Sequence, residues 1–240
     1  MPTHTPNASS LSLRPVRVWD LPTRLFHVAL IVCMVGLVIT GEVGGAAMQV
    51  HFYLGYSVLT LVLFRLLWGA VGGHWSRFAR FVPSLSRVVA YVRQLRAGES
   101  AQSVGHNPLG ALSVLAMLSF LLLQVLTGLL SDDEIAAAGP WTPLVSGETI
   151  AQATWYHTTV GKGILITLVS VHIAAVVFYR RFKNEDLITP MIHGDKSLPP
   201  QTPASRDNAK TRVLALLLCL ACGWVVRWLV QLGSAMPLAG

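Results

Sequence analysis

The sequence predicts an all-α integral membrane protein, a four-helix transmembrane bundle followed by a fifth, C-terminal transmembrane helix. Three observations predict this fold. Of the 240 residues, 53% are hydrophobic and only 12% charged, against roughly 25% charged residues in typical soluble domains. Five apolar runs approach or exceed the roughly 20 residues that a bilayer crossing needs. Basic residues gather in alternate connections between these runs, as the positive-inside rule describes.

Composition also narrows the function. The formal net charge is +7, but its distribution between apolar runs indicates membrane orientation rather than a nucleic-acid surface. We therefore expect no nucleic-acid partner. Cys33, Cys219 and Cys222 all lie inside apolar runs, so no extracellular disulfide framework is predicted.

The span boundaries follow from helix-terminus signals. Pro22 suits the start of the first helix, and Gly72-Gly73 ends the second. Asn107-Pro108 fits the N-cap and first turn of the third. The predicted spans are about residues 25–40, 51–70, 109–130, 155–179 and 213–232.

The connections predict the orientation. Residues 74–107 hold five arginines against the single acid Glu99, and periodic apolar positions around Val88 and Val92 predict an amphipathic helix on the membrane surface. Residues 131–154 hold four acidic residues and no Lys or Arg. The N-terminus is therefore expected inside the cell and the C-terminus outside.

Two histidines in the fourth span need a chemical explanation. His157 and His172 are fifteen residues apart, which is roughly 22 Å along a helix, so they lie near opposite membrane faces and cannot share one metal. At about 100° per residue their side chains are only some 60° apart around the axis, so both can face the bundle interior. Intramembrane polar rings require a bonded partner.

Depth in the membrane pairs these histidines with two others. His27 lies near the inner end of the first span and His51 at the outer end of the second. The pairs are then His27 with His172, and His51 with His157. Two facing imidazoles without a thiolate or carboxylate fit haem iron best, since zinc usually takes four ligands. The alternative is that each ring is bonded to a neighbouring carbonyl.

Other polar residues leave two interpretations open. Arg65 can neutralise haem propionates or extend to the inner headgroups, and Lys162 has the same two options at the outer end. His74 and His106 are expected in the inner headgroup layer, where a role at a quinone site is the alternative. Small residues allow close approach of either a planar ring or another helix; the candidates are Gly36, Gly55, Gly128 and Gly161.

Several motifs resemble those of one family. They are VWDLPTRLFH at 18–27, RLLWGAVGGHWSRFARF at 65–81, GHNPLG at 105–110, TGLLSDDEIAAAGP at 127–140, and the span from His157 to His172 with the trailing MIHGDK at 191–196. Together, over about residues 15–197, they resemble the prokaryotic cytochrome b561 and nickel-iron hydrogenase b-type cytochrome family.

The resemblance implies a four-helix core that holds two b haems, with ligands on the first, second and fourth spans. Carried over, these ligands are His27, His51, His157 and His172. The sequence departs from the pattern of many relatives at the outer end. Those relatives have one residue fewer between the two fourth-span histidines, and an acidic residue where this chain has Thr158.

The expected function is electron transfer, because two axial histidines leave no open position on the iron. We expect a di-haem cytochrome of the bacterial inner membrane that connects the quinone pool to a periplasmic or membrane-associated dehydrogenase, hydrogenase or c-type cytochrome. A second copy of the chain is also considered as a partner. One alternative is a stand-alone oxidoreductase that passes electrons from superoxide or another small molecule to quinone. Another is a haem-free membrane anchor or transporter.

The expected domain organisation follows from these spans. Residues 1–17 form a mobile cytoplasmic start, residues 18–197 the di-haem transmembrane domain, and residues 198–211 a flexible linker that is rich in proline. Residues 212–240 form the extra transmembrane helix. No conventional cleavable signal peptide is expected, since residues 1–13 lack an apolar core.

Overall fold

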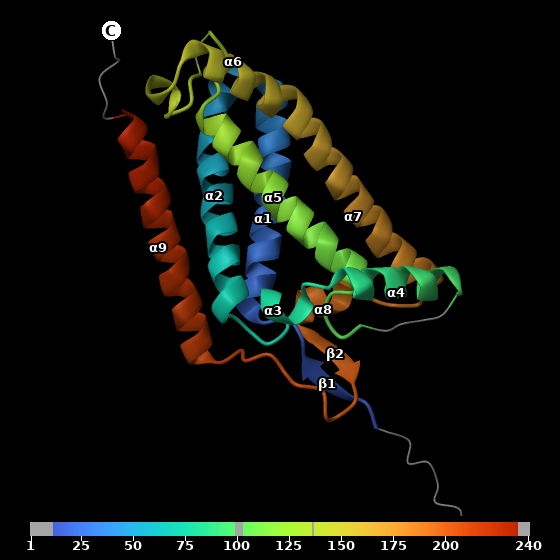
Figure 1. The fold of residues 1–240 in the computed structure, drawn as a ribbon. Helices are drawn as coiled ribbons and strands as arrows, with labels where there is room; N and C mark the ends of the chain where they lie inside the picture. Colours follow the sequence, from blue (N-terminus) through green and yellow to red (C-terminus); the bar gives the residue numbers. More distant parts are fainter. Residues whose placement is uncertain (1–11, 99–102, 136, 235–240) are drawn as a thin grey trace, which may run out of the picture.

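The computed structural model describes residues 12–98, 103–135 and 137–234. Five long helices form an elongated bundle (Figure 1). The elements are β1 (Arg14–Arg17), α1 (Leu21–Val43), η1 (Gly45–Ala47), α2 (Met48–Val71), α3 (Phe78–Phe81), α4 (Leu85–Arg96), α5 (Pro108–Leu129), η2 (Thr142–Leu144), α6 (Gly147–Trp155), η3 (Tyr156–Gly161), α7 (Lys162–Phe182), α8 (Ile188–His193), β2 (Asp195–Leu198) and α9 (Ala209–Ser234).

The five predicted spans are confirmed as helices long and apolar enough to cross a membrane. The fourth is a single continuous rod made of α6, η3 and α7, in which η3 is a π-helical segment. The third begins as expected, with the Asn107 side chain accepting a hydrogen bond from the Gly110 N–H at 2.7 Å. The predicted surface helix is α4, which lies across the end of the bundle (Figure 1).

Helix α2 is the centre of the bundle. In its most apolar 18-residue window 39% of the residues are buried, against 6% for α1. It packs against α1, α5 and α9, and α5 in turn packs against α7. Val58 and Val62 of α2 are fully buried in the core that these helices share. Helices α1 and α7 make little direct backbone contact within the described residues, so the bundle has one loosely closed boundary.

The two ends of the bundle differ in charge. The basic end carries β1, α3, α4, α8 and β2, and the acidic end carries α6 and the preceding loop of residues 131–146 (Figure 1). Arginines gather at the basic end, among them Arg24, Arg77 and Arg93. The charge asymmetry of the sequence is therefore an asymmetry of the folded molecule.

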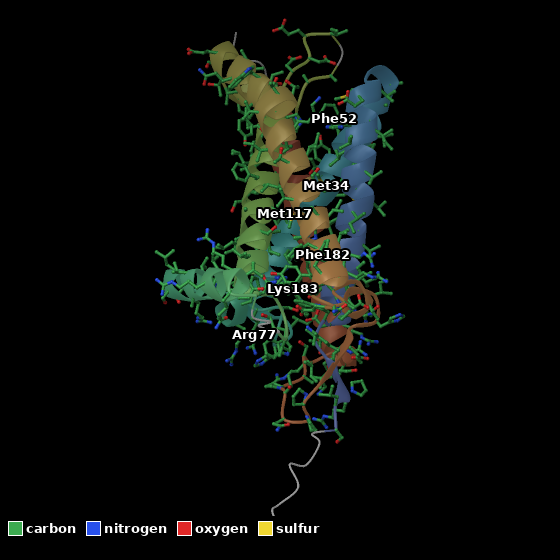
Figure 2. The ribbon with its side chains drawn as sticks, turned by 90° about the vertical axis from the view of Figure 1, so that its right-hand side faces the viewer. Met34, Phe52, Arg77, Met117, Phe182 and Lys183 are labelled. Carbon is green, nitrogen blue, oxygen red and sulfur yellow. The ribbon has the colours of Figure 1, made fainter. Side chains whose placement is uncertain are left out.

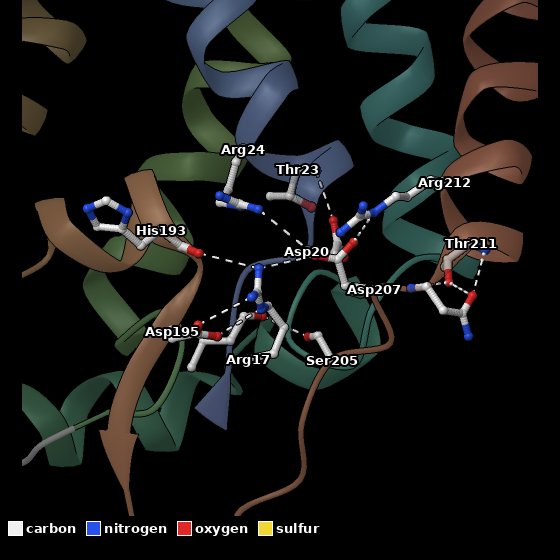
Figure 3. A network of polar contacts seen from close by, with 12 residues as sticks. Arg17, Asp20, Thr23, Arg24, His193, Asp195, Ser205, Asp207, Thr211 and Arg212 are labelled. Carbon is white, nitrogen blue, oxygen red and sulfur yellow. Dashed lines mark hydrogen bonds and ion pairs between the residues drawn. The ribbon is translucent and has the colours of Figure 1, made fainter. Parts of the chain in front are cut away.

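A two-stranded ribbon at the basic end was not expected from the sequence. Arg14–Arg17, placed in the mobile start above, instead forms β1 and pairs antiparallel with β2; residues 1–11 lie outside the described residues. Ion pairs hold the ribbon in place (Figure 3). The Arg17 guanidinium contacts Asp195 at 2.8 Å and Asp207 at 3.2 Å, and Asp207 also contacts Arg212 of α9 at 2.9 Å.

The segment treated above as a flexible linker is held by specific contacts. The Ser205 hydroxyl donates to the Val18 carbonyl at 2.7 Å, and the Ser205 N–H donates to the Arg17 carbonyl at 2.7 Å. The Trp75 indole N–H donates to the Pro203 carbonyl at 2.8 Å. The segment that leads into α9 is therefore tied to β1 and to the loop that follows α2.

Asp20 joins the beginning of α1 to the end of α2. Its fully buried carboxylate accepts four hydrogen bonds. The Thr23 N–H and Trp68 Nε1–H donate to Oδ1 at 2.8 and 3.1 Å; the Gly73 N–H and Ser76 hydroxyl donate to Oδ2 at 3.0 and 2.8 Å. A Cβ at Gly73 would lie 2.2 Å from Oδ2, so only glycine lets the loop approach this carboxylate.

We expect Asp20→Asn to destabilise the protein strongly. The amide NH2 would replace one carboxylate oxygen and face two donors, leaving buried groups unsatisfied at a cost of about 2–4 kcal/mol. Thermal unfolding in detergent, followed by circular dichroism, measures this loss. Glu148→Gln is the matched control, since Glu148 is exposed on α6; an equal effect of the two substitutions would contradict the role given to Asp20.

Candidate cofactor-binding site

The structure brings the four predicted histidines together as two pairs. The ring centroids of His27 on α1 and His172 on α7 are 6.5 Å apart, and those of His51 on α2 and His157 on η3 are 6.1 Å apart. The planes of the rings are inclined by 61° and 81° respectively. These are the pairs that membrane depth predicts.

Both separations match two imidazoles bound on opposite sides of one metal ion. With metal–nitrogen bonds of about 2.0–2.1 Å, the two ring centroids lie roughly 6–6.5 Å apart. In the described part of the chain, no group of three or more His, Cys, Asp or Glu side chains is arranged to hold a metal ion. A site with two imidazole ligands favours haem iron, because the planar macrocycle supplies the other four ligands.

The His27–His172 pair lies at the loosely closed boundary of the bundle. His27 comes from α1 and His172 from α7, the two helices with little direct contact. Figure 2 shows α7 in front of the bundle, between α5 and α1, with Met34 and Met117 about halfway along. Side chains rather than close backbone packing therefore fill the boundary where a planar cofactor would have to lie.

Backbone carbonyls orient both rings of the pair at the acidic end. Nδ1 of His51 is 3.2 Å from the Leu37 carbonyl, and Nδ1 of His157 is 2.8 Å from the Gln124 carbonyl. A hydrogen bond from Nδ1–H fixes the tautomer and leaves Nε2 free to bind metal, as is usual for metal-ligating histidines. The carbonyl partners named above as the alternative to metal binding thus occupy only one nitrogen of each ring.

Gln124 holds His157 in a second way. Its side-chain Nε2–H donates to the His157 carbonyl at 2.8 Å, so one residue of α5 contacts both the ring and the backbone of His157. The acceptor lies in the π-helical segment η3. Side chains inserted into the hydrogen-bond ladder are a common cause of such irregular turns, which occur often at functional sites. Sequence reasoning missed Gln124, although a glutamine inside an apolar span was a signal.

Two of the four candidate glycines make room for this arrangement. A Cβ at Gly128 would lie 2.7 Å from the His157 ring, and one at Gly161 would lie 1.9 Å from Gln124 Oε1. Gly36 instead faces Leu54, and a Cβ at Gly55 would meet nothing within 4 Å. Gly128 and Gly161 therefore allow the close approach between His157 and Gln124 of α5.

At the basic end the structure brings Arg65 and His106 together. Arg65 is 3% exposed, and its guanidinium lies over the Phe78 and Phe81 rings. Its Nη1 has no hydrogen-bond partner within residues 12–98, 103–135 and 137–234. Burial, followed by the charge of Arg65, lowers the pKa of His106 to about 3. His74 instead packs against Trp75.

Lys162 has a partner at the acidic end. Its Nζ lies 3.0 Å from Glu42 Oε1, and both side chains are about half exposed. The pair connects α7 to the end of α1. Because the charge of Lys162 is already balanced by Glu42, nothing in the structure requires a further anion beside it.

Comparison with known proteins identifies the family. Residues 18–194 match the family model described as prokaryotic cytochrome b561. This chain belongs to the prokaryotic cytochrome b561 family. The cytochrome is 26% identical to a probable Ni/Fe-hydrogenase B-type cytochrome subunit of Cupriavidus necator, over 78% of this chain and 89% of the relative. It is 25% identical to the subunit of the same name in Bradyrhizobium diazoefficiens, over 75% and 85%.

A probable Ni/Fe-hydrogenase 1 B-type cytochrome subunit of Escherichia coli is 23% identical, over 75% of this chain and 90% of the relative. Family and relatives agree with the membrane helices described above. The protein is a multi-pass membrane cytochrome of the b type, with haem b as its cofactor and electron transfer as its activity.

We expect Gln124→Leu to weaken haem binding at the His51–His157 pair. Leucine keeps the size of the side chain but cannot donate to the His157 carbonyl, and loss of a partner that orients a ligand typically costs about 10- to 100-fold in metal affinity. Haem content per chain, measured from the reduced pyridine haemochrome, checks this. Gln152→Leu is the control, since Gln152 is exposed on α6; equal haem contents in the two variants would count against the role of Gln124.

Proposed function

We propose that this cytochrome holds two b haems, one on His27 and His172 and one on His51 and His157, and transfers electrons across the membrane. The observation that carries the proposal is the pair of ring separations, 6.5 and 6.1 Å, each of which suits one bis-histidine iron. His157 and His172 lie on one helical rod, roughly 22 Å apart along its axis, so the two sites lie near opposite ends of the bundle.

The residues determine what such a site does. Each haem supplies a one-electron Fe(III)/Fe(II) couple. Two histidines at each site fill both axial positions, which excludes substrate from the metal and favours electron transfer over oxygen chemistry. The hydrogen bonds at His51 and His157 hold the rings in place whatever the oxidation state, so little rearrangement accompanies electron transfer.

The proposed exchange partners are quinone in the membrane and a redox protein at the membrane surface. Relatives named as subunits of Ni/Fe-hydrogenases support a hydrogenase as that protein; another dehydrogenase or a c-type cytochrome would use the same two sites. In this assignment the chain is an electron-transfer subunit of a larger oxidoreductase. No observation favours a stand-alone enzyme, a haem-free transporter or a homodimer over it.

The proposed orientation in the bacterial inner membrane places the basic end in the cytoplasm. Arginines near the ends of spans favour the cytoplasmic side, and Arg24, Arg77 and Arg180 are all at this end. The His27–His172 pair is then the inner site and the His51–His157 pair the outer site. The C-terminus beyond α9 would be periplasmic.

Replacing His172 by Ala is expected to remove the low-spin bis-histidine signal of the inner site alone. Haem content would fall from about two to about one per chain, and a redox titration would show one b-type component where the unmodified protein shows two. His193→Ala, outside the proposed ligands on α8, is the control. Loss of the outer component, or of both, would contradict the pairing.

Purification from native membranes in mild detergent tests the partner. We expect a hydrogenase or another dehydrogenase to co-purify, and its electron donor to reduce the haems before quinone is reduced. Reduction of the isolated chain by a small molecule alone, at the rate of the intact membranes, would instead favour a self-contained oxidoreductase. The result does not depend on the number of haems, so the proposed partner can be refuted while the two-haem proposal stands.

A further inference from the structure

Arg65 is a buried cation that no acidic side chain of the described residues contacts. Only 3% of the residue is exposed, and its Nη1 atom has no hydrogen-bond partner among the described residues. A buried, unpaired charge costs several kcal/mol, so such a residue requires an anionic partner. The outward extension to headgroups considered above does not occur, because the guanidinium stays inside the bundle.

Aromatic rings hold the guanidinium where it is. Its Cζ atom lies 5.0 Å from the Phe78 centroid and 5.8 Å from the Phe81 centroid. A Cβ at Gly69, one turn after Arg65, would lie 2.0 Å from Phe78, so glycine at that position admits the ring. Cation–π contact of this kind stabilises and orients a guanidinium, but its donors remain available in the plane.

His106 provides a second unpartnered polar atom in the same region. Its Nδ1 is buried and has no hydrogen-bond partner in the part of the chain that the structure describes. The ring packs 4.6 Å from Phe81, the same ring that lies under Arg65, and 4.8 Å from Trp19. Phe81 therefore places the two unpartnered groups, Arg65 Nη1 and His106 Nδ1, in one region. Arg65, His172 and His27 all act electrostatically on His106, so this region is at the same end of the bundle as the His27–His172 pair.

The nearest acid does not fill this role. Asp20 acts electrostatically on Arg65, but its two oxygens already accept four hydrogen bonds from other groups. The partner must come from outside the described side chains. A carboxylate suits it best, since guanidinium presents paired N–H donors that match two carboxylate oxygens, and a neutral imidazole N–H can add a third bond.

We propose that Arg65 and His106 together form a carboxylate-binding site for a propionate of the haem held by His27 and His172. The inference rests on the proposed function, which supplies the haem. It also assigns a role to His106, which precedes α5: its ring N–H would donate to the carboxylate that Arg65 of α2 binds. In this site Arg65 contacts the propionate directly. Its positive charge then neutralises the carboxylate and favours the reduced haem.

Reduction potentials of the two haems test the proposal, measured by spectroelectrochemical titration of the full chain. Arg65→Gln is expected to lower the potential of the inner haem, because removing a nearby positive charge disfavours reduction. Arg65→Lys should lower it less, and His106→Phe, which keeps the ring packing, should also lower it. Arg80→Gln is the control, since it removes the same charge from an exposed position on α3. An Arg65→Gln shift no larger than that of Arg80→Gln would overturn the proposal.

A haem with esterified propionates separates direct contact from general electrostatics. In protein assembled with the dimethyl ester, the Arg65→Gln and His106→Phe shifts should be much smaller, because interacting groups give non-additive changes. Undiminished shifts would mean that the anion is not a propionate. If the Arg65→Gln variant loses the haem, the potentials of Arg65→Lys and His106→Phe with the natural and the esterified haem are compared instead. Absence of an inner haem from the unmodified chain would instead refute the proposed function.

Discussion

The buried carboxylate of Asp20 is the constraint on which the geometry of the basic end depends. A carboxylate out of contact with water must have its lone pairs satisfied, and here the donors come from the first turn of α1, the last turn of α2 and the loop that follows it. The carboxylate thereby fixes the relative height of the two helices. His27 follows Asp20 by seven residues and Arg65 precedes Trp68 by three, so both lie within about two helical turns of the Asp20 contacts.

The fourth span illustrates how a change in residue number can be absorbed. The resemblance described above implies one residue fewer between the two fourth-span histidines in many relatives, and one additional residue would turn His157 by about 100° in a regular helix. The structure has the π-helical segment η3 at this position, and a π-helix has hydrogen bonds from i to i+5. A π-helical turn accommodates about one residue more than an α-helical turn. His157 can therefore still face His51.

Depth and charge were enough to predict the five spans and to group the histidines, because both depend on local composition and on the fixed rise of a helix. The role of the four rings as ligands remains a prediction. The ribbon of β1 and β2 could not be predicted, since it pairs residues that are distant in sequence and polar on the surface. The roles given to Gln124 and His106 were not predicted either, because they depend on groups from other helices: His157 for Gln124 and Arg65 for His106.

The boundary between α1 and α7 has a consequence for assembly. The other helix contacts are extensive, whereas this one is crossed at its acidic end by an exposed ion pair, Lys162 with Glu42, a kind of contact worth about 0–1 kcal/mol. The α1–α2 and α5–α7 interfaces therefore carry more of the helix packing than this boundary does. A cofactor bound between His27 and His172 would itself join α1 to α7, so it would add contacts that the two helices do not make with each other.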